Sequence, residues 1–165
     1  MTSPPYPIPH HYQGKEHTCG PAAMNMVLDA ILGAPLSEAE LEEWLATDAK
    51  IGTRQRTLAA FVERVGLQAR ALHTETTLDD LRELLRGGHI VVVLYHLADA
   101  EETFDHYAVI QRITDTEVVL HDPYLGPDLA LPVEAFEAMW ATVDHVPGRK
   151  DRWALAVRDP MVSRS

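Results

Sequence analysis

Four side chains have the types and the order along the chain to perform nucleophilic chemistry on a carbonyl group: Gln13, Cys19, His106 and Asp122. A thiolate attacks a carbonyl carbon once a neighbouring base has taken the thiol proton, and an imidazole is the usual base. We expect Cys19 to be the nucleophile, His106 its base, and Asp122 the carboxylate that orients the imidazole. The Gln13 amide is expected to donate, together with the Cys19 backbone N–H, to the oxyanion that forms on the substrate.

A helix is predicted to present Cys19 at its first position. Apolar residues recur at helical spacing over residues 19–32, Thr18 has the side chain of an N-cap, and Gly33 suits the end of the helix. The free backbone N–H groups and the positive end of the macrodipole at a helix N-terminus favour a thiolate over a thiol. The predicted helix therefore places the cysteine where attack is favoured, and we expect the helix itself to be buried.

Three more helices are predicted in the first half of the chain. Ser37 and Glu40 have the spacing of a capping box at the start of the second helix. Apolar residues at i, i+3, i+4 and i+7 predict helices over residues 58–65 and 78–85, each followed by glycine. The acidic stretch at residues 38–43 is interpreted as a solvated helix face.

The second half of the chain has short runs of β-branched and aromatic residues bounded by turn residues, which is typical of strands. We predict strands over residues 90–96, 106–113, 117–121 and 153–158, with a hairpin turn at 114–116 and a brief helix from Pro132. The apolar run at the start of the first strand is interpreted as central packing only. The predicted fold class is α+β, an N-terminal helical half packed on a C-terminal antiparallel sheet.

These strands are expected to bring the imidazole and the carboxylate to one place. His106 begins its predicted strand, so its side chain can project from the sheet edge toward the helix that carries Cys19. Asp122 directly follows the next strand across the hairpin. The sequence therefore predicts that the three side chains meet.

Four segments resemble one enzyme family. Gln13-Gly-Lys-Glu-His-Thr-Cys19-Gly-Pro-Ala-Ala is similar to the nucleophile segment of the C39 peptidases, papain-like enzymes of bacteria. Downstream, His106-Tyr-Ala-Val-Ile resembles the histidine segment of that family. Val118-Val-Leu-His-Asp122-Pro-Tyr-Leu-Gly126 resembles its Asp-Pro-x-x-Gly turn, and Leu131-Pro-Val-Glu-Ala-Phe136-Glu-Ala-Met-Trp140 resembles the helix that follows the turn. The similarity covers roughly residues 12–157, and the helices between residues 37 and 86 match only in general character.

The resemblance implies a papain-like cysteine proteinase fold and a hydrolase that cleaves a peptide or amide bond through a thioacyl intermediate. It implies the roles given above for the four residues. Some family members are fused to exporters and cut leader peptides after a Gly-Gly pair, but this sequence contains no transporter segment, so that substrate is not implied. Two other functions stay open: acyl or peptidyl transfer, and peptide binding without cleavage, which would not need the intact Cys19 and His106.

Each residue of the set also has a structural explanation. A lone cysteine is often a small buried apolar residue, and Asp122 with Gly126 could simply form a turn. His121 is a rival base, but neighbouring strand residues point to opposite faces, so His121 and Asp122 cannot both face Cys19. His106 is therefore the preferred base.

A zinc site is the other interpretation of the histidines before the cysteine. Imidazole and thiolate are zinc ligands, but the spacing matches no common zinc pattern and the chain has one cysteine only. We predict no metal and no cofactor, although four residues at the start of the chain suit the chemistry: His10, His11, His17 and Cys19.

Composition limits the remaining choices. A formal net charge of −11 argues against nucleic acid as a partner, because phosphate-binding surfaces need clustered Lys and Arg. No signal peptide or membrane-spanning run is recognised, so a cytoplasmic protein is expected. The length predicts one domain over residues 1–165, with an N-terminal loop at 1–11 and a tail at 159–165. The expected partner is a peptide or protein substrate, and the sequence leaves the oligomeric state open.

Overall fold

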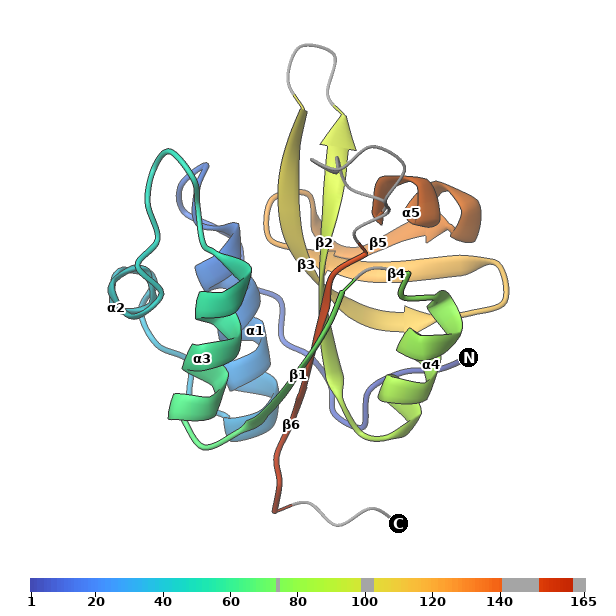
Figure 1. The fold of residues 1–165 in the computed structure, drawn as a ribbon, viewed down its shortest axis with the longest axis horizontal. Helices are drawn as coiled ribbons and strands as arrows, with labels where there is room; N and C mark the ends of the chain where they lie inside the picture. The colour runs from blue at the N-terminus through green and yellow to red at the C-terminus, as the bar shows by residue number, and fades with distance from the viewer. Residues whose placement is uncertain (74, 99–102, 141–151, 162–165) are drawn as a thin grey trace.

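The apolar periodicity of the first half forms helices as predicted. The computed structural model describes residues 1–73, 75–98, 103–140 and 152–161 (Figure 1). None of the helices in these ranges combines the length and the apolarity needed to cross a bilayer. They comprise the four expected helices and the short helix after Pro132: α1 (Cys19–Leu32), α2 (Glu38–Trp44), α3 (Gln55–Arg64), α4 (Leu78–Arg86) and α5 (Val133–Trp140).

The strands form one six-stranded sheet in the order β1-β6-β2-β3-β4-β5. All pairings between neighbouring strands are antiparallel. The turn at 114–116 joins β3 to β4, and the α+β prediction is confirmed. The strand bounds are β1 (Gln68–Leu72), β2 (Ile90–Ala98), β3 (Thr103–Ile113), β4 (Glu117–Asp122), β5 (Gly126–Pro132) and β6 (Ala154–Arg158).

The sequence did not predict β1 and β5, the two edge strands of the sheet. Each pairs with one neighbour only, β1 with β6 and β5 with β4. Most of their side chains are exposed or half-buried, so they lack a clear apolar alternation. β1 pairs with β6, which is distant along the chain, whereas β5 pairs with β4, which directly precedes it. Because β1 lies between α3 and α4, helices and strands also interleave more than the prediction allowed.

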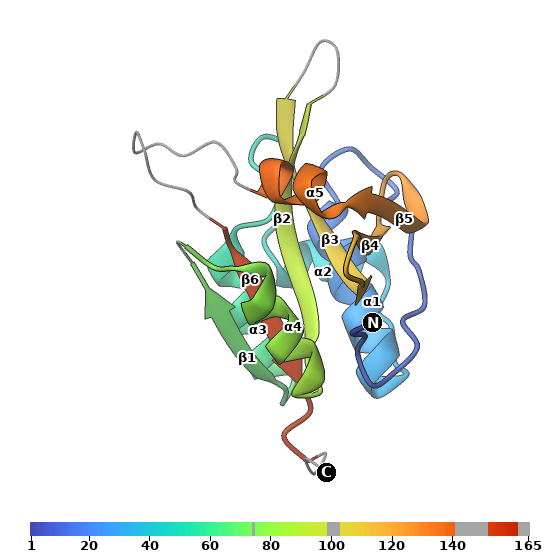
Figure 2. The same ribbon diagram turned by 90° about the vertical axis from the view of Figure 1, so that its right-hand side faces the viewer.

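β2 forms the centre of the core because both of its faces are covered. Figure 1 shows α1 and α3 on one side of the sheet and α4 and α5 on the other, and Figure 2 shows α4 and α5 in front of it. Successive β2 side chains alternate between two buried clusters. Ile90, Val92 and Leu94 pack with α1 and α3, whereas Val91, Val93 and Tyr95 pack with α4 and α5.

Of the two predicted helix caps, the one at Thr18 does not form and the one at Ser37 forms in part. Thr18 precedes α1, but its hydroxyl donates to the Lys15 carbonyl and accepts from the Lys15 N–H, so it closes a loop and does not cap the helix. Ser37 does accept from the Glu40 N–H at the start of α2. The Glu40 carboxylate accepts from the Ser37 hydroxyl instead of its backbone N–H, so the second half of the predicted capping box is wrong.

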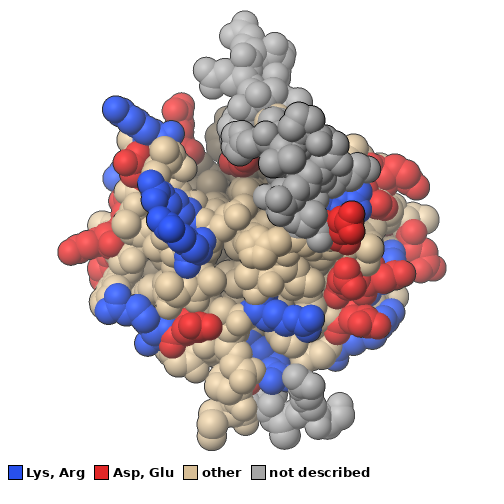
Figure 3. Space-filling model, in the orientation of Figure 1, with Lys and Arg blue, Asp and Glu red and all other residues tan. Residues whose placement is uncertain are grey.

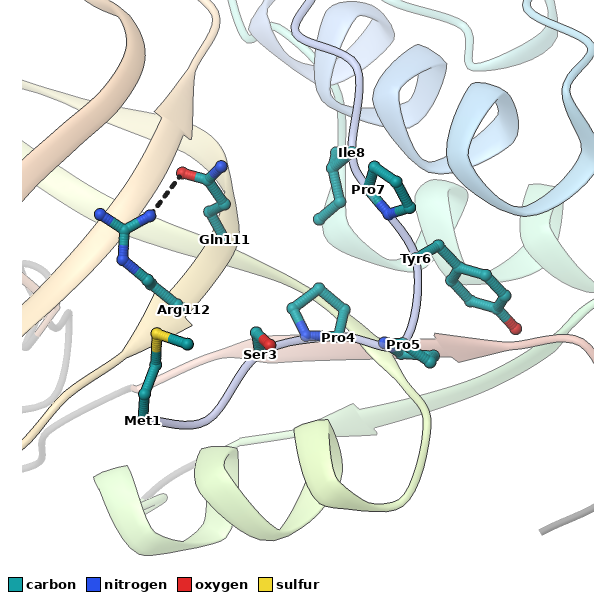
Figure 4. A pocket seen from close by; sticks show the side chains of 9 residues that line it. All are labelled: Met1, Ser3, Pro4, Pro5, Tyr6, Pro7, Ile8, Gln111 and Arg112. Carbon is teal, nitrogen blue, oxygen red and sulfur yellow. Dashed lines mark hydrogen bonds between the residues drawn. The ribbon is translucent and has the colours of Figure 1, made fainter. Parts of the chain in front are cut away.

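The N-terminal segment packs along the sheet. Thr2 forms an isolated antiparallel bridge with Ile113 of β3. A hollow of about 410 Å³ lies between this segment and β3, with Pro4, Tyr6 and Arg112 in its wall (Figure 4). None of the four predicted site residues lines this hollow.

Charged side chains are unevenly distributed over the surface. On the face seen in Figure 3, they surround a largely uncharged middle. Basic residues lie toward α3, which contains Arg56 and Arg64, and also along the lower edge and the right-hand side of this view. Acidic residues lie mostly toward α4, whose first turn contains Asp79 and Asp80, and toward α5.

Gly20, the second residue of α1, is predicted to be sensitive to substitution because Thr53 occupies the space beside it. A Cβ at this position would lie 2.4 Å from the Thr53 Oγ1 and 2.6 Å from the Thr53 Cβ. We expect Gly20→Ala to lower the free energy of unfolding by about 1–3 kcal/mol, the usual cost of overpacking. Urea unfolding measures this cost, and repeating the substitution in a Thr53→Gly background should remove most of it. An undiminished cost in that background would contradict the steric explanation.

Candidate active site

Cys19 lies at the first position of α1, as predicted, and remains at the margin of the core. Its residue is 9% exposed, whereas Ala23, Met24 and Met26 farther along the helix are fully buried. α1 packs against β3, the strand that carries His106. The helix N-terminus is thus held beside the sheet.

His106 does not begin its strand, contrary to the prediction. β3 starts at Thr103, so His106 is its fourth residue, directly opposite Tyr95 of β2. The pairing of β3 with β4 starts only at Val109, which is opposite His121. Among the described residues, β3 at His106 therefore pairs with β2 on one side and with no strand on the other. This open edge gives the imidazole access to the end of α1.

His106 and Asp122 form a buried hydrogen-bonded pair. His106 Nε2 lies 2.8 Å from Asp122 Oδ1, and the two side chains are 2% and 0% exposed. The same carboxylate oxygen accepts from the backbone N–H groups of Tyr124 and Leu125, at 2.8 and 2.7 Å. Asp122 therefore stabilises its own turn as well as the imidazole.

Tyr95 was not predicted to belong to this cluster. Its hydroxyl donates to Asp122 Oδ2, and the tyrosine is fully buried. The sequence interpretation assigned the run from Ile90 to packing, and packing does explain its aliphatic residues. The one available signal was the phenolic hydroxyl at the end of that run, because a buried hydroxyl requires a partner.

The contacts of His106 shift its pKa. Burial alone would lower the pKa, but hydrogen bonds to Asp122 and to Cys19, together with the charges of both, raise it to about 9. Burial would raise the pKa of Asp122, but the hydrogen bond and the charge of His106 hold it below its ordinary value. The arrangement therefore favours an imidazolium next to a carboxylate, with the cysteine side chain also in hydrogen-bonding reach of the ring.

Gln13 lies in the loop that precedes α1 and is tied to the turn after Asp122. Its backbone N–H donates to the Pro123 carbonyl at 2.9 Å. The side-chain amide donates to the carbonyls of Lys15 and Glu16, at 2.8 and 3.2 Å. The predicted oxyanion donor thus lies in the loop that ends at Cys19, with its amide hydrogen-bonded within that loop.

His121, the rival base, contacts the N-terminal segment. Its Nε2 lies 2.9 Å from the Ile8 carbonyl, and its Nδ1 accepts from the Asp128 N–H. Burial lowers the pKa of His121. Both ring nitrogens are therefore used in contacts with the N-terminal segment and with β5, which supports the choice of His106.

The histidines before Cys19 each contact a different group. His10 Nε2 lies 2.7 Å from the Asp122 carbonyl, which fixes the N-terminal segment to the end of β4. His11 pairs with Asp29 of α1 at 2.9 Å, and His17 with Glu42 of α2 at 3.3 Å. In the described part of the chain, no group of three His, Cys, Asp or Glu side chains is arranged to hold a metal ion.

Comparisons with known proteins agree with this architecture. A comparison with curated protein sequences gives no match. The peptidase domain of Streptococcus ComA, a bifunctional ABC transporter of a quorum-sensing pathway, is 20% identical with a TM-score of 0.69, over 90% of this chain and 96% of that domain. A putative C39-like peptidase from Bacillus anthracis is 15% identical with a TM-score of 0.70, over 100% and 99% of the two chains.

A third structure is the double-glycine-motif protease of an AMS/PCAT transporter, solved with its leader peptide. It is 15% identical with a TM-score of 0.67, over 95% of this chain and 97% of that one. These likenesses show a shared α+β papain-like fold. The sequence model of the peptidase C39 family matches residues 8–146, a span that contains all four predicted site residues. The chain therefore belongs to the peptidase C39 family.

Proposed function

We propose that this chain is a cysteine peptidase in which Cys19 is the nucleophile and His106 its general base and acid. The observation that carries the proposal is the buried His106–Asp122 pair, whose imidazole pKa is raised in part by the neighbouring Cys19 side chain. Because His106 Nε2 is hydrogen-bonded to Asp122, we assign Nδ1 as the ring nitrogen that exchanges a proton with the Cys19 sulfur. Family membership supports peptidase-type chemistry for such a set.

The proposed reaction has two steps. The Cys19 thiolate attacks the scissile carbonyl, and the oxyanion that forms accepts hydrogen bonds from the Cys19 N–H and the Gln13 amide. The C–N bond breaks as His106 gives its proton to the leaving amine, which leaves a thioester on Cys19. His106 then takes a proton from water, the hydroxide attacks the thioester, and the acid leaves as Cys19 becomes a thiolate again.

Gln13 must exchange one of its hydrogen bonds to act in this way. Its amide donates to the carbonyls of Lys15 and Glu16, at 2.8 and 3.2 Å. A rotation of the amide would replace the longer of these two hydrogen bonds with one to the oxyanion.

A peptide or protein is the proposed substrate. Two of the similar structures are peptidase domains of transporters, and one of them holds a leader peptide. Those substrates are known for those proteins and not for this chain. We therefore propose only that this chain cleaves a peptide bond, and we propose no recognition sequence.

Thiol labelling tests the first claim. A free thiol is only a few per cent thiolate at pH 7, so the His106 imidazolium should make Cys19 react with iodoacetamide at least about tenfold faster than in His106→Ala. Cys19→Ala should take up no label, as measured by intact mass. His96→Ala is the matched control, because His96 is a half-buried histidine that pairs with Asp105 at 3.1 Å. Equal rates in wild type and His106→Ala would contradict an activated thiolate.

Tyr95 is predicted to stabilise the ionised form of Asp122. Tyr95→Phe should lower the free energy of unfolding at pH 7 by about 1.5–3 kcal/mol, the usual contribution of a hydrogen bond to a charged group. The pKa of Asp122 is lower in the folded chain than in the unfolded chain. Its ionised form therefore adds to the free energy of unfolding above the unfolded-state pKa, and this contribution is lost as the pH falls through the folded-state pKa. The cost of Tyr95→Phe in urea-unfolding measurements should therefore stay constant from pH 7 down to the ordinary carboxyl pKa of 3.8 and shrink as the pH falls below that value.

Tyr107→Phe is the matched control for this experiment. The Tyr107 hydroxyl is also buried and donates to a neutral acceptor, the Thr53 carbonyl, at 2.7 Å. Its removal should have a cost that does not change over the same pH range. If both substitutions showed the same pH dependence, Tyr95 would have no special link to the Asp122 charge.

Protonated His106 is predicted to stabilise the folded chain, and this effect should be lost at alkaline pH. The pKa of His106 is raised from 6.5 to about 9 in the folded chain. Its contribution to the free energy of unfolding is therefore fully present below pH 6.5 and is lost as the pH rises to about 9. The difference in unfolding free energy between wild type and His106→Gln should decrease by about 3 kcal/mol over this range. Cys19→Ala removes one of the causes of the raised pKa and should bring the decrease to lower pH. A difference that stays constant with pH would be inconsistent with a protonated His106.

A further inference from the structure

Two carboxylates of α2 contact the loop that carries Gln13. Glu38 Oε2 accepts from the Gly14 N–H at 2.9 Å. Both carboxylate oxygens of Glu42 lie 3.1 Å from Lys15 Nζ, and one of them also lies 3.3 Å from His17 Nε2. The Glu42 side chain is only 17% exposed. For these two residues, the sequence interpretation of a solvated helix face is wrong.

Gly14 makes the approach of Glu38 possible. A Cβ at this position would lie 2.7 Å from Glu38 Oε2, so any other residue would displace the carboxylate. The contact thus depends on both residue types, a glycine in the loop and a glutamate at the first position of α2. Because the obstructing atom is the end of a flexible side chain, Gly14→Ala would separate the two without a large steric cost.

The same loop is held on its other side by the turn of Asp122. Gln13 N–H donates to the Pro123 carbonyl at 2.9 Å, and Thr18 hydrogen-bonds to the backbone of Lys15. The loop therefore lies between α2 and the turn. Removal of the α2 contacts would leave it attached through the Gln13 peptide and its own internal hydrogen bonds.

We propose that Glu38 and Glu42 are positioning residues, which hold the loop of residues 13–18 so that the Gln13 amide can reach the oxyanion. This inference rests on the proposed function, since it assigns a task to Gln13 at the Cys19 site. Neither carboxylate touches the reacting atoms. Their effect should therefore appear in acyl transfer to Cys19, which forms an oxyanion, and not in simple alkylation of the thiolate.

Two small reagents separate these effects. Iodoacetamide alkylates the Cys19 thiolate by displacing iodide, with no oxyanion. p-Nitrophenyl acetate acylates it: the sulfur attacks the ester carbonyl, the C–O bond breaks, and p-nitrophenolate leaves with the electron pair, so that an acetyl thioester remains. The first rate reports the thiolate alone, and the second reports the thiolate together with the oxyanion donors. Release of p-nitrophenolate and intact mass measure acylation.

Glu38→Ala, Glu42→Ala and Gly14→Ala should each slow acylation by about tenfold, a fraction of the effect of losing an oxyanion donor outright. Alkylation should change by less than about twofold, since the thiolate and its imidazolium are untouched. Glu38→Gln keeps an acceptor for the Gly14 N–H and should restore most of the rate. Glu43→Ala is the matched control, because Glu43 is an exposed residue of the same helix and should leave both rates at the wild-type level.

Several results would overturn the positioning role. It fails if Glu38→Ala slows both reagents equally, if it slows neither, or if Glu43→Ala slows acylation as much. It also fails if Glu38→Gln is no better than Glu38→Ala at equal melting temperature. Failure of the proposed function would give a different result. In that case, Cys19 of the folded wild type would react with both reagents no faster than Cys19 of the unfolded chain.

Discussion

The rest of the site depends on one buried interaction, the hydrogen bond between the Asp122 carboxylate and His106. A carboxylate with no exposed surface is costly unless donors surround it. Here the imidazole, the Tyr95 hydroxyl and two backbone N–H groups of the following turn supply them. The fold must therefore bring β2, β3 and the end of β4 together at one point. That requirement fixes the ring of His106 in a single orientation.

The N-terminal segment and α1 are fitted around this point. His10 contacts the Asp122 carbonyl and the Gln13 N–H contacts the Pro123 carbonyl, so the chain before α1 follows the end of β4. Thr18 then closes the loop and α1 starts at Cys19. The helix can approach His106 because β4 is not paired with β3 at that position. A local loss of strand pairing thus provides the access that the proposed chemistry needs.

Low sequence identity is compatible with this degree of structural similarity. Chains that are 15–20% identical share the fold with TM-scores of 0.67–0.70. Most of the core needs only apolar side chains of suitable volume, which many sequences supply. The polar contacts around Asp122 are more demanding, because each donor must meet its acceptor at about 3 Å. Similarity in the short segments around Cys19, His106 and Asp122 is therefore more informative than overall identity.

The sequence by itself determined the helices, the central strands and the identity of the residues that form the buried pair, because local periodicity and capping residues act within a few positions. It did not determine β1 and β5, whose edge positions leave little apolar pattern, or the true start of β3 before His106. Tyr95, Glu38 and Glu42 were assigned to packing or solvent, since their partners Asp122 and the loop of residues 13–18 come from distant parts of the chain. Only the tertiary structure decides which donor meets which acceptor, because hydrogen bonds act over about 3 Å in space and not along the sequence.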